Sequence, residues 1–232
     1  MTLKAKQEIE NADVIVGYKT YVKLIDQIIK PETEVFSGNM GQEVDRARKA
    51  IQKALENKQV VVVSSGDSGV YGMAGVVFET AAYEKTKIPI EVVPGVTAAT
   101  AAAGTLGAPL VGDFAVISLS DILTPWNLIE KRLRAAAETD FGIVLYNPKS
   151  KGRKKPLALA HKIFLEYRDP KTHVGIVKNA KREGENAIIT SLKDMMNYEI
   201  DMTTVVVVAS SKTYRIDNNL VTPRGYSFSK TK

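Results

Sequence analysis

The sequence predicts an α/β protein made of two α/β domains, residues 1–110 and 111–232. Short β-branched runs alternate with longer segments of helical periodicity, as in sheets covered by helices. In the first half every strand is followed by a helix, which is typical of a parallel sheet. Several strands of the second half follow one another closely, which is typical of a mixed sheet. Glycine and proline interrupt the pattern at residues 105–112, where we place the boundary.

Periodicity and β-branched composition define the elements of the first domain. The clearest helix is QEVDRARKAIQKALEN, residues 42–57, whose apolar residues lie on one face. A small-residue helix at 96–104 is expected to end at its glycine. The predicted helices are 2–12, 18–29, 42–57, 70–83 and 96–104, and the predicted strands are 13–17, 59–65 and 88–93.

The second domain begins with a strand at residues 113–120 and a helix at 126–139. A second helix, 156–167, carries proline in its first turn, where the missing N–H costs no hydrogen bond. The other predicted strands are 141–146, 173–178, 187–191, 203–209 and 214–221. A cleft between two domains of this kind is where small ligands tend to bind.

Composition excludes several classes of site. The chain has 232 residues, 44% of them hydrophobic, and no cysteine, which excludes disulfides and thiolate nucleophiles. Because the sequence has no cysteine, we expect a reduced, cytoplasmic compartment, and we also expect no metal site. No apolar run reaches about 18 residues, so we expect no membrane association. The net charge of +6 is scattered, and its densest cluster is KSKGRKK, residues 149–155. A solvated surface, a polyanionic small molecule and a nucleic acid are all compatible with this cluster.

The stretch VVVVSSGDSGVYGMAG, residues 60–75, predicts a strand that leads into a glycine loop and a helix. Such loops let backbone N–H groups approach a ligand closely. The sequence lacks the Gly-Lys-Ser/Thr of a phosphate-binding P-loop, and the interval from Gly66 to Gly69 is one residue too long for a dinucleotide loop. Asp67 would repel a pyrophosphate but suits a ribose or a cation. A tight turn that needs glycines for itself is the alternative.

Three further loops follow predicted strands. PGVTAATAAAG, residues 94–104, places Thr97 at the start of a small-residue helix. YNPKSKGR, residues 146–153, has Asn before Pro, a turn signal, and then basic residues that suit carboxylates. VKNAKREGE, residues 177–185, is a second basic loop.

Together these stretches resemble the tetrapyrrole (corrin and sirohaem) methyltransferases, which use S-adenosylmethionine. Residues 66–72 are similar to the family pattern Gly-Asp-x-x-x-Tyr/Phe-Gly, and residues 94–98 are similar to Pro-Gly-x-Thr-Ala. The stretches ADVIVGYKTY, LSDILTPW, DFGIVLYNPKSKGR, VKNAKREGE and TYRIDNNLVTPRGY resemble the branch that methylates carbon 17 of precorrin-3B in cobalamin synthesis. Ser68 stands where many members have proline. The family's first strand and its Gly-x-Gly-Pro-Gly-Asp loop have no counterpart in this sequence. The resemblance places that loop at the floor of the active site, so full activity is not expected from this sequence without it.

The resemblance implies a homodimer of two-domain chains with S-adenosylmethionine in the interdomain cleft and S-adenosylhomocysteine as product. It also implies methylation of a precorrin-3-type tetrapyrrole at carbon 17, accompanied by ring contraction. The implied cofactor-binding residues are Ser65, Gly66, Asp67, Val70, Thr97, Ala98, Asn147 and Ala180. The polycarboxylate substrate is expected to meet Lys19, Ser118, Lys149, Ser150, Lys151 and Arg153.

Methyl transfer requires alignment of donor and acceptor and exclusion of water, not a metal or a protein nucleophile. The two histidines, His161 and His173, are therefore expected to be structural or exposed. Tyr18 and Asp121 are candidates for handling protons during ring contraction, with ordinary exposed polar residues as the alternative.

Three other functions stay open on the sequence alone. A different tetrapyrrole C-methyltransferase of the corrin or sirohaem pathway is the first alternative, although the YNPKSKGR and TPRGY stretches argue against it. A nicotinamide-dependent oxidoreductase is disfavoured by the glycine spacing and by Asp67. A basic nucleic-acid-binding module would need interleaved aromatic residues or a continuous basic helix, which the sequence lacks.

Overall fold

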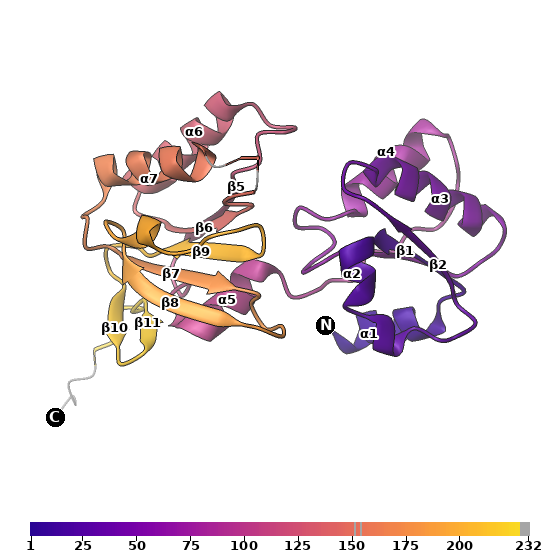
Figure 1. Ribbon diagram of the computed structural model, residues 1–232, viewed down its shortest axis with the longest axis horizontal. Coiled ribbons are helices and arrows are strands. Elements are labelled where there is room, and N and C mark those ends of the chain that lie inside the picture. The colour runs from indigo at the N-terminus through magenta and orange to yellow at the C-terminus, as the bar shows by residue number, and fades with distance from the viewer. Residues whose placement is uncertain (151, 154, 228–232) are drawn as a thin grey trace. The chain divides into compact units, whose positions relative to one another are not determined.

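The computed structural model describes residues 1–150, 152–153 and 155–227 and divides the chain into two compact units, residues 1–97 and 98–232. Figure 1 shows both units as sheets covered by helices. The division falls earlier than the expected stretch 105–112. Its physical reason is that helix α5 (Ala98–Leu106) packs on the sheet of the second unit through Ala99, Ala102 and Leu106.

The first unit is built on a parallel three-stranded sheet with the order β2-β1-β3. Its elements are α1 (Leu3–Asn11), β1 (Val14–Tyr18), α2 (Lys19–Lys23), η1 (Asp26–Ile28), β2 (Glu34–Gly38), α3 (Glu43–Leu55), β3 (Val60–Val63) and α4 (Ala74–Tyr83). Alternate strand residues face opposite ways: Ile15 and Val63 pack with α1 and η1, whereas Val14 and Val16 pack with α3. The expected parallel sheet is therefore confirmed for this half.

Two predicted elements of the first unit differ from the structure, and one strand was missed. The helix expected at 18–29 is split into α2 and η1, and the strand β2 was not predicted. Residues 88–93 were expected to be a strand, but they pair with none of the strands described. Ile90 instead packs against the apolar cluster of Ala47, Met73 and Val77.

The second unit contains a mixed five-stranded sheet with the order β5-β6-β9-β7-β8, as its strand spacing predicted. A small sheet of order β10-β11-β4 lies beside it in the same unit. The remaining elements are β4 (Gly107–Ala108), β5 (Phe114–Ser118), α6 (Trp126–Glu138), β6 (Gly142–Tyr146), α7 (Lys155–Tyr167), β7 (His173–Lys178), β8 (Asn186–Ser191), η2 (Met195–Asn197), β9 (Thr204–Val208), β10 (Tyr214–Ile216) and β11 (Asn219–Val221).

Helices cover both faces of the five-stranded sheet. Leu133 of α6 and Phe164 of α7 pack on one face, and α5 packs on the other. The close approach of α5 depends on Gly175 in β7, because a Cβ there would lie 2.2 Å from a methyl carbon of Leu106. The helix passes through Gly104 and ends at Leu106, followed by Gly107 with a φ of +112°. The expected end at Gly104 was therefore wrong by one half-turn of helix, and the glycine that ends the helix is Gly107.

Candidate functional site

The register of the first sheet brings its strand ends to one edge. Tyr18 pairs with Gly38 of β2, and the preceding Gly17 pairs with Val63 of β3. Because all three strands are parallel, the segments that follow them start at the same edge. Tyr18 ends β1 and Lys19 follows it, and Ser65, Gly66 and Asp67 lie in the segment that follows β3. Ligands in parallel α/β sheets bind at this carboxyl edge.

The Asp67 carboxylate joins two of the predicted cofactor loops. Its Oδ1 accepts from the N–H of Gly69 at 2.8 Å, and its Oδ2 accepts from the N–H of Gly95 at 2.8 Å. The first contact closes a turn within the glycine loop, as aspartate commonly does two residues ahead of itself. The second contact crosses to the loop of residues 94–97. In this structure both carboxylate oxygens of Asp67 therefore accept hydrogen bonds from the chain's own backbone.

Two glycines allow this junction to be tight. A Cβ on Gly95 would lie 2.0 Å from the carbonyl oxygen of Gly66, which is too close for any residue with a side chain. A Cβ on Gly72 would lie 2.5 Å from the carbonyl oxygen of Ser68. Gly66 itself has a φ of +73°, in the region that favours glycine. Close approach of backbone to backbone thus explains Gly72 and Gly95, and the positive φ explains Gly66.

The other predicted cofactor residues of the first unit lie in the same two loops. Ser65 and Val70 are half-buried in the glycine loop, and Gly66 is exposed. Thr97 is half-buried at the end of the first unit, and Ala98 begins α5 in the second. Small and partly exposed residues of this kind leave backbone groups accessible to a ligand.

In the second unit, β5, β6 and β7 run in the same direction, since β6 and β7 are both antiparallel to β9. Ser118 ends β5 and pairs with Tyr146, which ends β6. The next residue, Asn147, has a φ of +52° and donates from Nδ2 to the Ser118 Oγ at 2.9 Å. The Tyr146 hydroxyl accepts from the N–H of Ala99 at 2.6 Å, which connects β6 to the first turn of α5.

Arg153 holds the segments that follow β5 and β6. Its Nη1 donates to the carbonyl oxygen of Leu119 at 2.6 Å, and its Nη2 donates to that of Asn147 at 3.3 Å. Nη1 also lies 3.7 Å from Oδ1 of Asp121, and only 14% of the Arg153 side chain is exposed. Backbone hydrogen bonds in both directions between Ser150 and Arg153 close the loop. Much of the hydrogen-bonding capacity of Arg153 is therefore used within the protein.

Ala180 follows β7 and packs against the apolar cluster under α5. The turn after it is fixed by Glu185, whose carboxylate accepts from the Lys181 N–H and from Thr105 Oγ1. Hydrogen bonding to the Lys181 N–H, and also to Thr105, holds the pKa of Glu185 below its ordinary value. This network ties the β7–β8 turn to α5.

The predicted residues therefore fall into two groups, each at the carboxyl edge of its own sheet. Tyr18, Lys19, Ser65, Gly66, Asp67, Val70 and Thr97 belong to the first unit. Ala98, Ser118, Asp121, Asn147, Lys149, Ser150, Arg153 and Ala180 belong to the second. Lys151 lies outside the described residues. The sequence analysis did not identify the Tyr146 hydroxyl or the loop after β2. The glycines at positions 38 and 41 are the sequence feature that could have indicated this loop.

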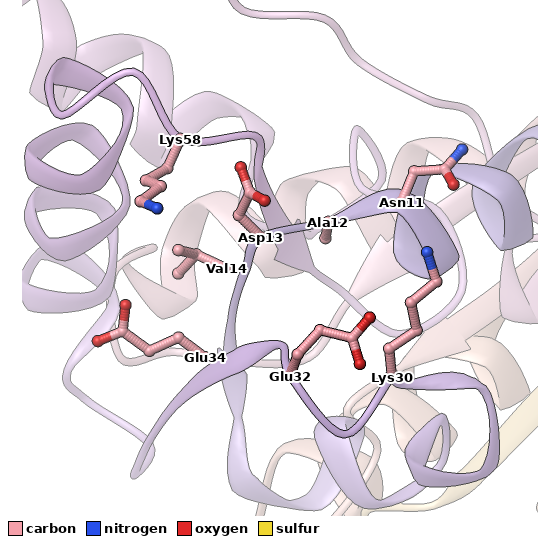
Figure 2. A pocket seen from close by; sticks show the side chains of 8 residues that line it. All are labelled: Asn11, Ala12, Asp13, Val14, Lys30, Glu32, Glu34 and Lys58. Atoms are coloured by element: carbon pink, nitrogen blue, oxygen red, sulfur yellow. The ribbon is translucent and has the colours of Figure 1, made fainter.

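A cavity of about 280 Å³ lies at the opposite edge of the first sheet. Figure 2 shows that carboxylates of Asp13, Glu32 and Glu34 and the amines of Lys30 and Lys58 line it. Val14 and Glu34 begin β1 and β2, so this cavity borders the amino ends of the strands. It contains none of the predicted site residues, and Asp13 is already bonded there to the N–H of Gln59.

Comparison with known proteins shows extensive similarity. The family model described as Tetrapyrrole (Corrin/Porphyrin) Methylases matches residues 1–196. A "Cobalt-factor III methyltransferase" of Priestia megaterium is 47% identical over 230 residues, which are 97% of this chain and 42% of that protein. A "Probable cobalt-factor III C(17)-methyltransferase" of Salmonella typhimurium is 44% identical over 227 residues, 98% of this chain and 94% of that protein. The chain thus spans less than half of the first relative and nearly all of the second.

Among solved structures, one titled "Crystal structure of the methyltransferase CobJ" matches with a TM-score of 0.90 and 36% sequence identity. The match covers 96% of this chain and 93% of that one. The similarity therefore extends over both units of the fold.

Proposed function

The chain belongs to the tetrapyrrole (corrin/porphyrin) methylases, and from this we propose that it methylates carbon 17 of a cobalt-containing precorrin-3-type tetrapyrrole during cobalamin biosynthesis. The observation that carries the proposal is the 44% identity to a C(17)-methyltransferase over almost the whole of both chains. Relatives named for cobalt-factor III reach 47% identity to this chain, and these names favour a substrate that already carries cobalt.

The methyl donor in the proposal is S-adenosylmethionine. When bound, it supplies a methyl group on a positively charged sulfur, and the sulfur retains the bonding electron pair as the methyl group leaves. The residues fit such a molecule, because exposed Gly66 and half-buried Ser65 and Thr97 present small side chains and backbone groups without a clustered positive charge. Neutral hydrogen-bonding groups suit a nucleoside and an amino acid better than they suit phosphates.

In the second unit, we assign Asn147 and Ala180 to the same cofactor. The positive φ of Asn147 and its hydrogen bond to Ser118 fix the direction in which the chain leaves β6. The backbone of residues 147–148 therefore has a defined position. Ser65, Gly66, Asp67, Val70, Thr97 and Ala98 complete the proposed cofactor set. Asp67 contributes by holding two loops together, as its two backbone contacts indicate.

Basic and hydroxyl side chains are assigned to the carboxylates of the substrate. Lys19 is exposed at the start of α2, and Lys149 and Ser150 are half-buried in the loop after β6. Ser118 and Arg153 belong to the same assignment, with Arg153 shaping the loop as much as pairing with substrate. Tyr18 and Asp121 are proposed to handle protons, and the ion pair of Asp121 with Arg153 keeps that carboxylate beside the loop.

We also propose that the chain acts as a homodimer in the cytoplasm, as the family resemblance implies. Among the described residues, no helix combines the length and apolar character needed to cross a membrane. Light scattering coupled to gel filtration measures the assembly directly, and a monomeric mass would contradict the homodimer.

The function is tested with the whole chain in two steps. Isothermal titration should show binding of S-adenosylhomocysteine, with NAD as the matched negative ligand. Incubation with S-adenosylmethionine and cobalt-factor III should then add one methyl group, located at carbon 17 by NMR. Methylation at a different carbon, or binding of NAD in place of S-adenosylhomocysteine, would overturn the assignment.

A further inference from the structure

A buried arginine that is not among the proposed site residues lies beside the carboxyl edge of the first sheet. Arg46 of α3 is 7% exposed. Its Nη1 donates to the carbonyl oxygen of Asn39 at 2.5 Å, and its Nη2 lies 3.2 Å from Oε1 of Glu43. Its Nε is buried without a hydrogen-bond partner among the described residues. Burying a charge with incomplete pairing is costly, so stability alone is a weak explanation for an arginine here.

Arg46 connects the segments that follow two different strands. Asn39 comes directly after β2. Nη2 of Arg46 also lies 3.8 Å from the sulfur of Met73, and the Met73 N–H donates to the Ser64 Oγ at 3.0 Å. Ser64 comes directly after β3, and Met73 ends the glycine loop. The guanidinium therefore links the loop after β2 to the proposed cofactor loop.

The loop after β2, residues 39–42, has a backbone that its neighbours fix. The Asn39 N–H donates to Oε1 of Gln42 at 2.7 Å, and the Gly41 N–H donates to Oε1 of Glu43 at 3.1 Å. Gly41 has a φ of +86°, which favours glycine. Burial raises the pKa of Glu43, but hydrogen bonds from the backbone and from Arg46 outweigh it and lower the pKa, so the carboxylate stays charged.

This fixed loop carries two exposed side chains and lies at the carboxyl edge. Met40 is 63% exposed, and Asn39 is exposed as well. The pairing of Tyr18 with Gly38 places the loop next to Tyr18 and Lys19, at the edge assigned to substrate. A methionine side chain adapts to flat apolar surfaces, and an amide both donates and accepts hydrogen bonds. A tetrapyrrole offers both partners, an apolar ring face and peripheral carboxylates.

We infer that Arg46 is a positioning residue that fixes residues 39–41 so that the side chains of Asn39 and Met40 bind the tetrapyrrole substrate. The inference rests on the proposed function, because it names a substrate contact within that site. Arg46 itself touches no substrate. It acts indirectly, through its hydrogen bond to the Asn39 carbonyl oxygen and its contact with Met73.

The test separates substrate binding from folding and from cofactor binding. Asn39→Ala and Met40→Ala change exposed side chains and should leave the thermal midpoint and the Kd for S-adenosylhomocysteine unchanged. Each should raise the KM for cobalt-factor III about tenfold, the effect of losing one good contact, with little change in kcat. Arg46→Met should raise the same KM, and Arg46→Lys should restore part of it.

Arg48→Met is the matched control, since Arg48 lies on the same helix but is exposed and pairs with Glu84. It should leave KM at the wild-type value. The inference is overturned if the Asn39 and Met40 variants keep the wild-type KM, or if Arg46→Met lowers the thermal midpoint alone. If the unmodified chain neither binds S-adenosylhomocysteine nor transfers methyl groups, the proposed function has failed, and this inference fails with it.

Discussion

At the scale of single residues, the carboxylate of Asp67 determines how two loops of the first unit meet. It accepts from the Gly69 N–H in its own loop and from the Gly95 N–H in the other. The second contact lies where the backbone of Gly95 is so close to the Gly66 carbonyl oxygen that a Cβ on residue 95 would not fit. A ligand that binds this edge therefore meets a surface whose shape is set before binding, which reduces the entropy lost on association.

Asp67→Ala should weaken binding of S-adenosylhomocysteine about tenfold to a hundredfold, because it leaves two backbone N–H groups of the loops without partners. The fold should persist, since Asp67 lies outside the apolar clusters of this unit. Isothermal titration gives the affinity, and circular dichroism confirms the fold. Ser68→Ala is a milder control, because it removes a single 3.3 Å bond to the Val93 carbonyl. An unchanged Kd for Asp67→Ala would show that the loops hold together without the carboxylate.

At the scale of elements, Arg168 connects the ends of two helices in the second unit. It follows α7 directly, and it donates from Nε to the Ala137 carbonyl at 2.7 Å and from Nη2 to the Ala136 carbonyl at 3.0 Å. These carbonyls belong to the last turn of α6, where helices leave acceptors unsatisfied. Asp140, beyond that helix end, pairs with the same guanidinium.

Arg168→Met should destabilise the second unit by about 3 kcal/mol, because it removes the hydrogen bonds of a buried guanidinium to three carbonyl groups and takes from Asp140 its cationic partner. Urea unfolding followed by far-ultraviolet circular dichroism measures the loss. Arg134→Met is the control, since Arg134 pairs with Glu130 and Glu166 on an exposed helix face and should change stability little. Equal effects of the two substitutions would contradict the capping role of Arg168.

Helices and strands were predictable where their own residues carry the pattern. The helix expected at 42–57 matches α3 because its apolar residues repeat with helical spacing, and β7 has its expected bounds. β2 was missed because it is a short edge strand with most of its side chains exposed, which leaves no alternation to detect. Residues 88–93 have a strand-like composition, but strand formation also requires a pairing neighbour, which composition does not reveal.

For the candidate site, the loops could be predicted from the sequence, but the contacts between their residues could not. Glycine spacing and turn residues identified the segments around Gly66, Gly95 and Asn147. The bonds of Tyr146 to Ala99 and of Arg153 to Leu119 join residues far apart in the chain, and no local pattern indicates them. For the same reason, Asp67 was expected to meet a ribose or a cation, whereas in this structure both of its oxygens bind backbone N–H groups.

At the scale of the whole molecule, stability should depend on pH through carboxylates that are paired in the folded state. Burial raises the pKa of Asp201, but hydrogen bonds from Lys178, Thr203 and Thr204 outweigh it and lower the pKa from 3.8 to about 2. A lowered folded-state pKa stabilises the protein above pH 3.8, and this contribution is lost as the pH falls toward 2.

Asp201→Asn should therefore lower the free energy of unfolding by on the order of 1 kcal/mol at neutral pH, after allowance for the partial exposure of the ion pair. The difference from the unmodified protein should shrink as the pH is lowered from 4 toward 2. Urea midpoints across this range measure it, and Asp169→Asn is a control without a partner cation in the described ion pairs. A difference that is constant with pH would contradict the assignment to this carboxylate.

The order of the five-stranded sheet has a consequence for how the chain is made. β9 occupies the middle of that sheet, between β6 and β7, and all five of its residues are buried. It is also among the last strands in the sequence. While the ribosome is still synthesising the protein, β6 and β7 have both emerged with unpaired inner edges that only β9 will fill. The nascent second unit therefore exposes unpaired strand edges until residues 204–208 leave the exit tunnel, which makes chaperone capture most valuable before that point.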